Sequence, residues 1–217
     1  MSERLKVAVL ISGRGSNLQA LLRACTAPGY PAEIVLVLSN RADAAGLAFA
    51  HEAGVATAVI SHRDFPDRAG FDAAMDAEIR RHGAGLICLA GFMRLIGDTF
   101  IEAWRDRMIN IHPSLLPSFR GLDTHARALE AGVKLAGCTV HFVRPEVDTG
   151  PIIAQAAVPV LPDDTPDTLA ARILEQEHVI YPMALRLVAE GRVAIEGDHA
   201  VVAAGTTGTA LRNPDPA

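Results

Sequence analysis

The sequence has little of what metal sites and disulfide frameworks require. It contains three cysteines in 217 residues, Cys25, Cys88 and Cys138, and they stand far apart. It has no C-x-x-C pair and no H-E-x-x-H motif, so neither a structural zinc site nor a zinc protease is indicated. An odd number of isolated cysteines argues against disulfides and favours a reducing compartment. We therefore expect no bound metal, a cytoplasmic location, and a buried Cys88 within its apolar run.

Excess positive charge and long apolar runs are also absent. The formal net charge is −5 and the sequence pI is about 5.9, which argues against a broad nucleic-acid or polybasic membrane surface. No stretch is long and apolar enough for a transmembrane helix, and the first residues lack the pattern of a signal peptide. We expect small-molecule partners and neither nucleic acid nor membrane, while the sequence leaves a monomer or a homodimer open.

Aromatic residues make up 5% of the chain, so aliphatic side chains must form most of the core. Short apolar runs alternate with segments of helical period, which predicts a doubly wound, mostly parallel sheet with flanking helices and a Rossmann-like order. The expected strands are 7–11, 34–38, 56–60, 86–90 and 108–111, and the expected helices are 16–25, 43–54, 68–82 and 98–105.

The second half of the chain predicts a different pairing. Runs at 136–143 and 152–160 are joined by a short loop, which favours an antiparallel hairpin. A helix at 124–130 precedes them, and a long helix follows from Thr165-Pro166. Residues 193–195 and 200–203 could form a terminal hairpin. We expect one domain over residues 1–204 and a flexible tail at 205–217, which is rich in Thr, Gly and Pro.

The segment N-I-H-P-S-L-L-P at 110–117 carries the strongest chemical signal. Asn110 and His112 stand two apart at the end of an apolar run, so both side chains should point to one face of the strand. An amide and an imidazole side by side can both donate hydrogen bonds to an oxygen that gains negative charge. Asp148, at the tip of the later hairpin, is their expected partner. The simpler alternatives are a capping pair for Asn110 and His112 and turn chemistry for Asp148.

The segment S-G-R-G-S-N at 12–17 joins the first strand to the first helix and predicts an anion site. It lacks the third glycine of a dinucleotide fingerprint, since Leu18 stands there, and the Gly-Lys ending of a Walker A loop. The backbone of Gly15 and Ser16 and the side chains of Ser16 and Asn17 could hold one phosphate. The alternative is a plain turn with Ser16 as helix N-cap.

These candidates share one edge of the predicted sheet. Ligands of doubly wound sheets bind at the carboxyl ends of the strands. Residues 12–17 follow the first strand, residues 91–94 follow the fourth, and Asn110 and His112 end the fifth. Their common placement supports a single site more strongly than any one motif does.

Together the motifs resemble the phosphoribosylglycinamide formyltransferase family, folate-dependent enzymes of purine synthesis. The matching pieces are L-I-S-G-R-G-S-N-L-Q at 10–19, A-G-F-M-R at 90–94, the segment at 110–117, H-F at 141–142, D-T-G-P at 148–151 and Q-E-H-V-I-Y-P at 176–182. The resemblance covers roughly residues 5–196. The N-H-D set marks the wider formyltransferase superfamily, and the 12–17 loop narrows the match to this family.

The resemblance implies transfer of a formyl group from 10-formyltetrahydrofolate, a co-substrate, to the amine of glycinamide ribonucleotide. It implies Asn110, His112 and Asp148 as the catalytic set, without a covalent enzyme intermediate or a metal. It assigns the phosphate to Gly15, Ser16 and Asn17 and a further substrate contact to Glu177. The implied folate pocket comprises Phe92, Met93, Arg94, Leu95, Ile96, Arg144, Glu146 and Val147, with Ser114 and His141 as supporting residues.

Two positions depart from the family's pattern, and three other functions compete. Asp123 and Leu174 replace residues found in some relatives, which leaves details of substrate contact open. A formyltetrahydrofolate hydrolase would use the same three groups with water, but such relatives carry an added N-terminal regulatory domain. A methionyl-tRNA formyltransferase would add a C-terminal nucleic-acid-binding domain. A non-catalytic sensor of a phosphorylated metabolite would need only the 12–17 loop and would leave Asn110, His112 and Asp148 unexplained.

Overall fold

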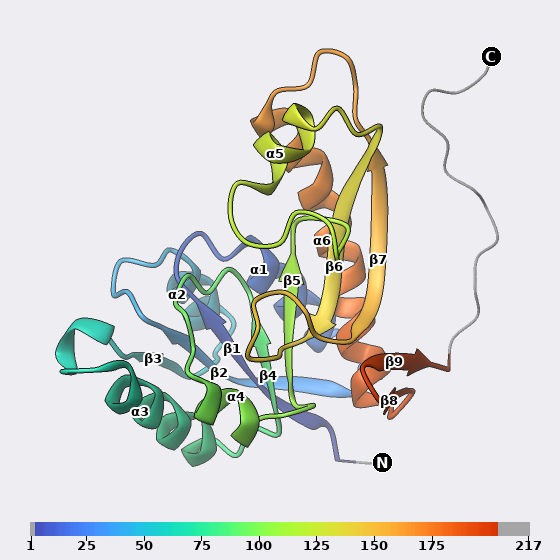
Figure 1. Cartoon of the computed structure of the whole chain (residues 1–217). Coiled ribbons are helices and arrows are strands. Elements are labelled where there is room, and N and C mark those ends of the chain that lie inside the picture. The colour runs from blue at the N-terminus through green and yellow to red at the C-terminus, as the bar shows by residue number, and fades with distance from the viewer. Residues whose placement is uncertain (1–2, 204–217) are drawn as a thin grey trace.

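The computed structural model describes residues 3–203, and the predicted tail at 205–217 lies outside them. Figure 1 shows strands and helices alternating along the chain. The strands are β1 (Leu5–Ile11), β2 (Ala32–Ser39), β3 (Thr57–Val59), β4 (Leu86–Leu89), β5 (Met108–His112), β6 (Leu135–Phe142), β7 (Ile152–Pro159), β8 (Val193–Glu196) and β9 (His199–Val202). The helices are α1 (Ser16–Thr26), α2 (Gly46–Glu52), α3 (Arg68–Arg81), α4 (Asp98–Ala103), α5 (Thr124–Glu130) and α6 (Pro166–Ala189), with a 3-10 turn η1 (His62–Asp64) that was not predicted.

Seven strands form the main sheet in the order β3-β2-β1-β4-β5-β6-β7. The pairs from β3 to β5 are parallel, whereas β6 runs antiparallel to β5 and β7 antiparallel to β6. The predicted mostly parallel sheet with an antiparallel pair in its C-terminal part is therefore confirmed. β8 and β9 form the expected terminal hairpin.

The strand order reverses between β1 and β4. From β1 the chain builds outward through β2 and β3, then returns to β4 on the other side of β1. A reversal of this kind leaves a crevice at the carboxyl ends of the two central strands, where ligands of doubly wound sheets bind. The fold thus positions the loops after β1 and β4 beside each other.

Both faces of the sheet are covered, which explains the continuous apolar runs of the central strands. Along β1, Val7, Val9 and Ile11 join one core, whereas Ala8 and Leu10 join the other. The first core contains apolar side chains of α1 and α6, and the second contains those of α3 and α4 (Figure 1). Cys88 is fully buried as expected, and the other two cysteines are buried as well.

Candidate active site

The candidate site lies where β1, β4 and β5 end. We call residues 12–17 the glycine loop, residues 91–96 the Gly91 loop and residues 119–123 the cover loop. The glycine loop follows β1 and the Gly91 loop follows β4. Asn110 and His112 lie at the C-terminal end of the β5 strand. Asp148 comes from the loop between β6 and β7. The predicted residues therefore come from both the parallel and the antiparallel part of the sheet.

Asp148 lies between two histidines of neighbouring strands. Its Oδ2 atom is 3.3 Å from Nδ1 of His112, and its Oδ1 atom is 3.7 Å from Nε2 of His141. The antiparallel register of β5 and β6 pairs Asn110 with His141, so all four side chains meet on one face. The structure thus brings together the three predicted catalytic residues and the predicted supporting residue His141.

His141 orients the amide of Asn110. Nδ1 of His141 donates to the carbonyl oxygen of Phe142 at 2.9 Å, so Nε2 of the neutral ring is left as an acceptor. Asn110 Nδ2 lies 3.3 Å from that Nε2 and donates to it. Burial lowers the pKa of His141, which keeps the ring neutral and this arrangement intact near neutral pH. One N–H of the Asn110 amide is thereby fixed, and the second stays available to a ligand.

The loop that carries Asp148 has an unusual backbone. Asp148 has φ 55°, in the left-handed region that most non-glycine residues avoid. A Cβ atom at Gly150 would lie 1.7 Å from the carbonyl oxygen of Phe142, so only glycine fits there. Turn chemistry is therefore real in this loop, as the simpler alternative predicted. It does not account for the Asp148 side chain, which is 10% exposed and faces the two histidines.

The cover loop lies directly over His112 and Asp148. His112 Nε2 lies 3.0 Å from the carbonyl oxygen of Phe119 and donates to it, because a carbonyl can only accept. The backbone N–H of Gly121 donates to Asp148 Oδ2 at 2.9 Å. These contacts leave His112 6% exposed. In this conformation the imidazole is closed off by the chain itself.

The cover loop is a bent segment held by contacts at several points. Phe119, Gly121 and Asp123 have φ of 53°, 80° and 55°, and the two non-glycine residues among them are strained. Arg127 on α5 donates to the carbonyl oxygens of Arg120 at 2.6 Å and Leu122 at 3.2 Å. Such a conformation depends on its partners, so it can change when those partners bind something else.

The glycine loop leads into the first turn of α1, which has no side-chain cap. α1 begins at Ser16, with Gly15 as N-cap at φ 77° and no capping side chain, so the alternative of Ser16 as N-cap is wrong. A Cβ atom at Gly15 would lie 2.6 Å from Cα of Gly46, the first residue of α2. No acceptor in residues 3–203 takes the backbone N–H groups of Ser16 and Asn17. This first turn offers free donors to an anion.

Glu177 reaches the glycine loop from α6. Asn17 Nδ2 donates to Glu177 Oε2 at 2.6 Å, across 160 positions of sequence. Glu177 is 7% exposed, and burial raises its pKa although the Asn17 bond opposes the shift. Within the described part of the chain, the buried Asn17 Oδ1 has no hydrogen-bond partner. The Asn17 side chain is thus committed to Glu177, which leaves the predicted phosphate grip to the backbone and Ser16.

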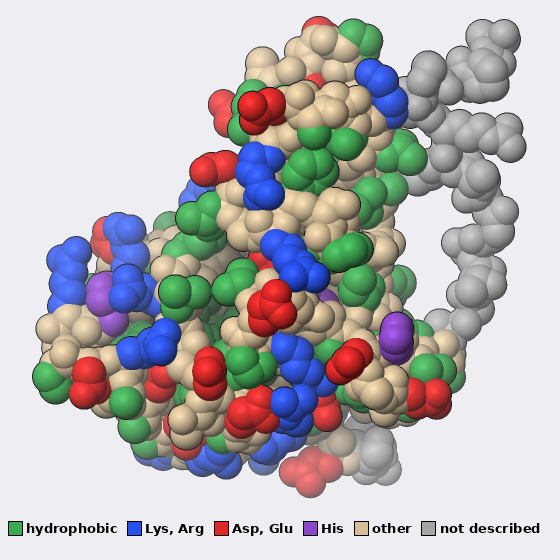
Figure 2. Space-filling model, viewed as in Figure 1, with side chains coloured by type: hydrophobic (Ala, Val, Ile, Leu, Met, Phe, Trp, Pro, Cys, Tyr) green, Lys and Arg blue, Asp and Glu red, His purple; other side chains and the backbone are tan. Residues whose placement is uncertain are grey.

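The predicted folate-pocket residues divide into anchors and exposed groups. Phe92 and Ile96 pack against the second core, whereas Met93 and Leu95 are each 68% exposed and Val147 is 50% exposed. Large exposed apolar side chains in one region mark ligand surfaces, and Figure 2 shows hydrophobic side chains in the middle of this face of the molecule.

Two of the three charged members of that set, Arg144 and Glu146, lie in ion pairs. Arg144 pairs with Asp106 at 2.6 Å, and Glu146 pairs with Arg120 of the cover loop at 3.2 Å. Arg94 lies near His62, and burial of the imidazole together with the Arg94 charge lowers the pKa of His62. The Glu146 pair links the predicted folate pocket to the cover loop.

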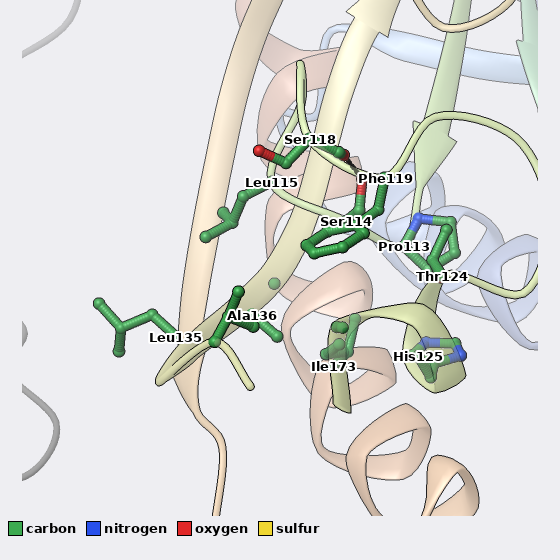
Figure 3. Close-up of a pocket in the computed structure, with 13 residues that line it drawn as sticks. Pro113, Ser114, Leu115, Ser118, Phe119, Thr124, His125, Leu135, Ala136 and Ile173 are labelled. Carbon is green, nitrogen blue, oxygen red and sulfur yellow. Dashed lines mark hydrogen bonds between the residues drawn. The ribbon is translucent and has the colours of Figure 1, made fainter. Parts of the chain in front are cut away.

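Ser114 supports the turn after His112 and does not face Asp148. Its hydroxyl donates to the carbonyl oxygen of Ser118 at 2.6 Å, and its own carbonyl accepts from Thr139 Oγ1 at 2.7 Å. A cavity of about 90 Å³ lies behind this turn, between it, α5 and α6. Figure 3 shows the Phe119 ring facing His125 and Ile173 across it. Phe119 of the cover loop lines this cavity, whereas His112 and Asp148 do not.

Several residues at the site were not singled out from the sequence. Thr139 Oγ1 accepts from the backbone N–H of Leu116 at 3.1 Å, in addition to its bond to Ser114. Ser12 and Asn40 are buried and hydrogen-bonded to each other at 2.5 Å. Both stand directly after predicted strands, and a polar residue at a strand end was the signal that could have found them.

Two further kinds of site are absent from residues 3–203. Nowhere in that range do three or more His, Cys, Asp or Glu side chains cluster so that they could hold a metal ion. None of its helices combines the length and the apolar character needed to cross a membrane.

Comparisons with known proteins agree on one family. Residues 5–185 match the family model described as formyl transferase. The chain is 43% identical to phosphoribosylglycinamide formyltransferase of Escherichia coli strain K12, covering 90% of this chain and 92% of that protein. It is 51% identical to the trifunctional purine biosynthetic protein adenosine-3 of Gallus gallus, of which it spans 19%. Glycinamide ribonucleotide transformylase 1 from Symbiobacterium toebii superposes with a TM-score of 0.91 at 50% identity, covering 93% of this chain and 95% of that one.

Proposed function

The chain belongs to the phosphoribosylglycinamide formyltransferases within the formyl transferase family, and from this we propose that it formylates glycinamide ribonucleotide with 10-formyltetrahydrofolate in purine biosynthesis. The observation that carries the proposal is a carboxyl edge of the sheet with two chemically distinct ends. An open helix start and Glu177 lie at one end, and Asn110, His112 and Asp148 meet at the other. The first end suits the phosphate of a phosphorylated amine, and the second suits its reaction with an acyl donor.

The ribonucleotide end holds the acceptor. The free backbone N–H groups of Ser16 and Asn17, with the Ser16 hydroxyl, bind the phosphate at the positive end of α1. The Glu177 carboxylate accepts hydrogen bonds from ribose hydroxyls, and the unpartnered Asn17 Oδ1 takes a further donor from the ligand. A buried acceptor without a partner is costly, so binding a hydroxyl there favours the complex.

The transfer end stabilises the tetrahedral intermediate. The substrate amine attacks the formyl carbon, and the formyl oxygen becomes an oxyanion. The free N–H of Asn110 and an N–H of His112 donate to that oxygen. The carboxylate of Asp148, 3.3 Å from His112 Nδ1, stabilises a proton on the ring. The amine loses one proton and N10 of the folate gains one when the C–N10 bond breaks, and Asp148 supports this transfer directly or through a water.

The cover loop must release His112 before the reaction. The carbonyl oxygen of Phe119 now accepts from His112 Nε2, in the role that the formyl oxygen would take. Release of this bond and of the Gly121–Asp148 bond frees both groups at once. We therefore assign the loop as a cover that moves off His112 and Asp148 when substrates bind and then closes over the substrates, which excludes water during transfer.

The folate, which donates the formyl group, lies beside the transfer end. The backbone of the Gly91 loop and of residues 144–147 faces the pterin, with the exposed side chains of Met93, Leu95 and Val147 as an apolar border. We assign residues 1–204 to one formyltransferase domain that works in the cytoplasm on small-molecule substrates, as a monomer or homodimer. No metal takes part in the proposed steps.

A formyl-transfer assay tests the proposal. Purified protein is mixed with 10-formyltetrahydrofolate, with and without glycinamide ribonucleotide, and the deformylated folate is followed by absorbance. Product that depends on the ribonucleotide supports the transferase. An equal rate without the ribonucleotide would mean hydrolysis, and tight ribonucleotide binding with no product would mean a binding module.

A further inference from the structure

A buried serine hydroxyl joins the ends of three strands. Ser12, the residue after β1, donates through Oγ to Asn40 Oδ1 at 2.5 Å. The same Oγ accepts the backbone N–H of Met93 at 2.8 Å. Asn40 follows β2 and Met93 lies in the Gly91 loop after β4. Ser12 and Asn40 are 6% and 5% exposed, so water cannot readily replace these bonds.

The direction of the hydroxyl is fixed by its partners. An amide carbonyl oxygen can only accept and a backbone N–H can only donate. The Ser12 proton must therefore point to Asn40, which leaves a lone pair of Oγ for Met93. Asn40 thus sets the orientation that makes Ser12 an acceptor for the Gly91 loop.

The backbone strengthens the same link. Ser12 N donates to the carbonyl oxygen of Gly91 at 3.2 Å, and together with the Met93 bond this ties the Gly91 loop to the end of β1 at two points. Ser12 is the first residue of the glycine loop, and the carbonyl oxygen of the next residue, Gly13, accepts from Gly46 N at 3.0 Å. Ser12 therefore stands at the junction between the loop after β1 and the loop after β4, where the strand order reverses.

We propose that Ser12 is a positioning residue for formyl transfer, which holds the backbone of the Gly91 loop at a set distance from the glycine loop. This inference rests on the proposed function, because it assigns the folate to one loop and the phosphate to the other. Ser12 touches neither substrate and acts through Met93. Loss of its hydroxyl loosens the folate side, which keeps only the backbone bond from Ser12 N to the Gly91 carbonyl oxygen, and leaves the phosphate side fastened by Gly46.

The expected consequence is a split between the two substrates. In Ser12→Ala, the Met93 N–H loses its acceptor in the protein and the buried Asn40 Oδ1 loses its donor, so the Gly91 loop is held less firmly. We expect the KM for 10-formyltetrahydrofolate to rise by about tenfold and the Kd for glycinamide ribonucleotide alone to change by less than about twofold. A general loss of folding would instead affect both ligands together.

Ser39→Ala is the matched control. Ser39 ends β2 and is fully buried, but its hydroxyl bonds only within its own turn, donating to the carbonyl oxygen of Arg41 at 2.8 Å. This variant also loses one buried hydroxyl, yet it leaves the Met93 anchor in place. Its folate KM should match that of the wild type.

Hydrogen exchange at the Met93 amide provides a direct readout. Exchange should accelerate in Ser12→Ala and stay at the wild-type rate in Ser39→Ala. Ser12→Cys, with a weaker acceptor of similar shape, should fall between the two and serves if Ser12→Ala does not fold. Faster exchange together with the folate-selective rise in KM supports the proposal.

Two results would overturn the positioning role: unchanged exchange at Met93 in Ser12→Ala, or equal loss of affinity for both substrates. A wild-type protein with no ribonucleotide-dependent transfer would instead overturn the proposed function. In that case the exchange comparison still decides whether Ser12 anchors the Gly91 loop.

Discussion

The two ends of the crevice differ in how far the protein satisfies its own polar groups. At the glycine loop, the N–H groups of Ser16 and Asn17 meet no acceptor in the described part of the chain. At the other end, both ring nitrogens of His112 and both carboxylate oxygens of Asp148 already face groups of the protein. The phosphate end is open and preformed, whereas the transfer end is closed by the cover loop.

This difference follows from the chemistry that each end serves in the proposed reaction. A phosphate is charged in every state of the reaction, so a fixed set of donors can wait for it. A tetrahedral oxyanion exists only during transfer, and its donors work best in a site from which water is excluded. A loop that satisfies those donors at rest prevents them from being buried without partners.

The largest effect is expected at the transfer end. Asp148→Asn removes the carboxylate charge beside His112, and asparagine tolerates the left-handed backbone of this position. We expect kcat to fall by ~10²–10⁴, because both proton transfer and the charge that supports the imidazolium are lost. Steady-state kinetics of formyl transfer measure the change.

Ribonucleotide binding separates the two ends in this variant. Calorimetric titration of Asp148→Asn with glycinamide ribonucleotide should give the wild-type Kd, because the glycine loop is untouched. A Kd that weakens as much as kcat falls would show that the ends are not independent.

An intermediate effect is expected at the phosphate end from Gly15→Ala. The new Cβ would lie 2.6 Å from Gly46 Cα in a backbone with φ 77°, so the loop must shift. With strain of order 1–3 kcal/mol and about 1.4 kcal/mol for each tenfold change, we expect the KM for the ribonucleotide to rise about 10–100-fold.

Gly54→Ala is the control for Gly15→Ala. Gly54 also has a positive φ of 69°, but a Cβ there meets nothing within 4 Å. It carries the left-handed strain without the clash and lies outside the glycine loop. Its ribonucleotide KM should match the wild type, and an equal rise in both variants would rule out the clash with Gly46 as the cause.

The smallest effect is on stability and comes from Glu177→Gln. Burial raises the pKa of Glu177, so the folded state favours its neutral form. That stability is fully present below the unfolded pKa of about 4.3 and is lost as pH rises through the folded pKa. Glutamine does not ionise, so at neutral pH the free energy of unfolding of the variant should exceed that of the wild type by roughly 1 kcal/mol, and its denaturation midpoint should be higher. Near the unfolded pKa the two proteins should have the same free energy of unfolding.

The same variant should bind the ribonucleotide more weakly, because a carboxylate accepts stronger hydrogen bonds from hydroxyl groups than an amide does. Urea unfolding at acid and neutral pH, with ribonucleotide titration, checks both expectations. Greater stability without weaker binding would mean that Glu177 supports Asn17 but does not contact the substrate.

Much of the fold followed from local pattern. Apolar runs such as residues 7–11 and 86–90 predict buried strands because both faces of a central parallel strand need apolar side chains. The helix at 68–82 and the hairpin around Asp148 followed from spacing and from a short loop. The 3-10 turn at His62–Asp64 was missed, since it is a single short turn in which the carbonyl oxygen and the hydroxyl of Ser61 accept from the N–H groups of Asp64 and Arg63.

The candidate site also has one part that the sequence predicted and another that it did not. The clustering of Asn110, His112 and Asp148 was predicted from motif order and strand-end placement, and the roles of these residues stay a prediction. The bond from Asn17 to Glu177 joins residues 160 positions apart, and the link from Ser12 to Met93 spans 81. Such pairs cannot be read from the sequence, because the residues around each partner indicate only its own helix, strand or loop and not the distant residue that it contacts.

By itself, the sequence determined the alternation of strands and helices, the glycine loop after β1 and the position of Asn110 and His112 at the end of β5. The tertiary structure alone decided that His141 orients Asn110, that the cover loop closes over His112, and that the Asn17 side chain serves Glu177. The physical reason is that backbone patterns depend on neighbours within a few residues. Hydrogen bonds between buried side chains depend on which strands and helices the completed sheet places in contact.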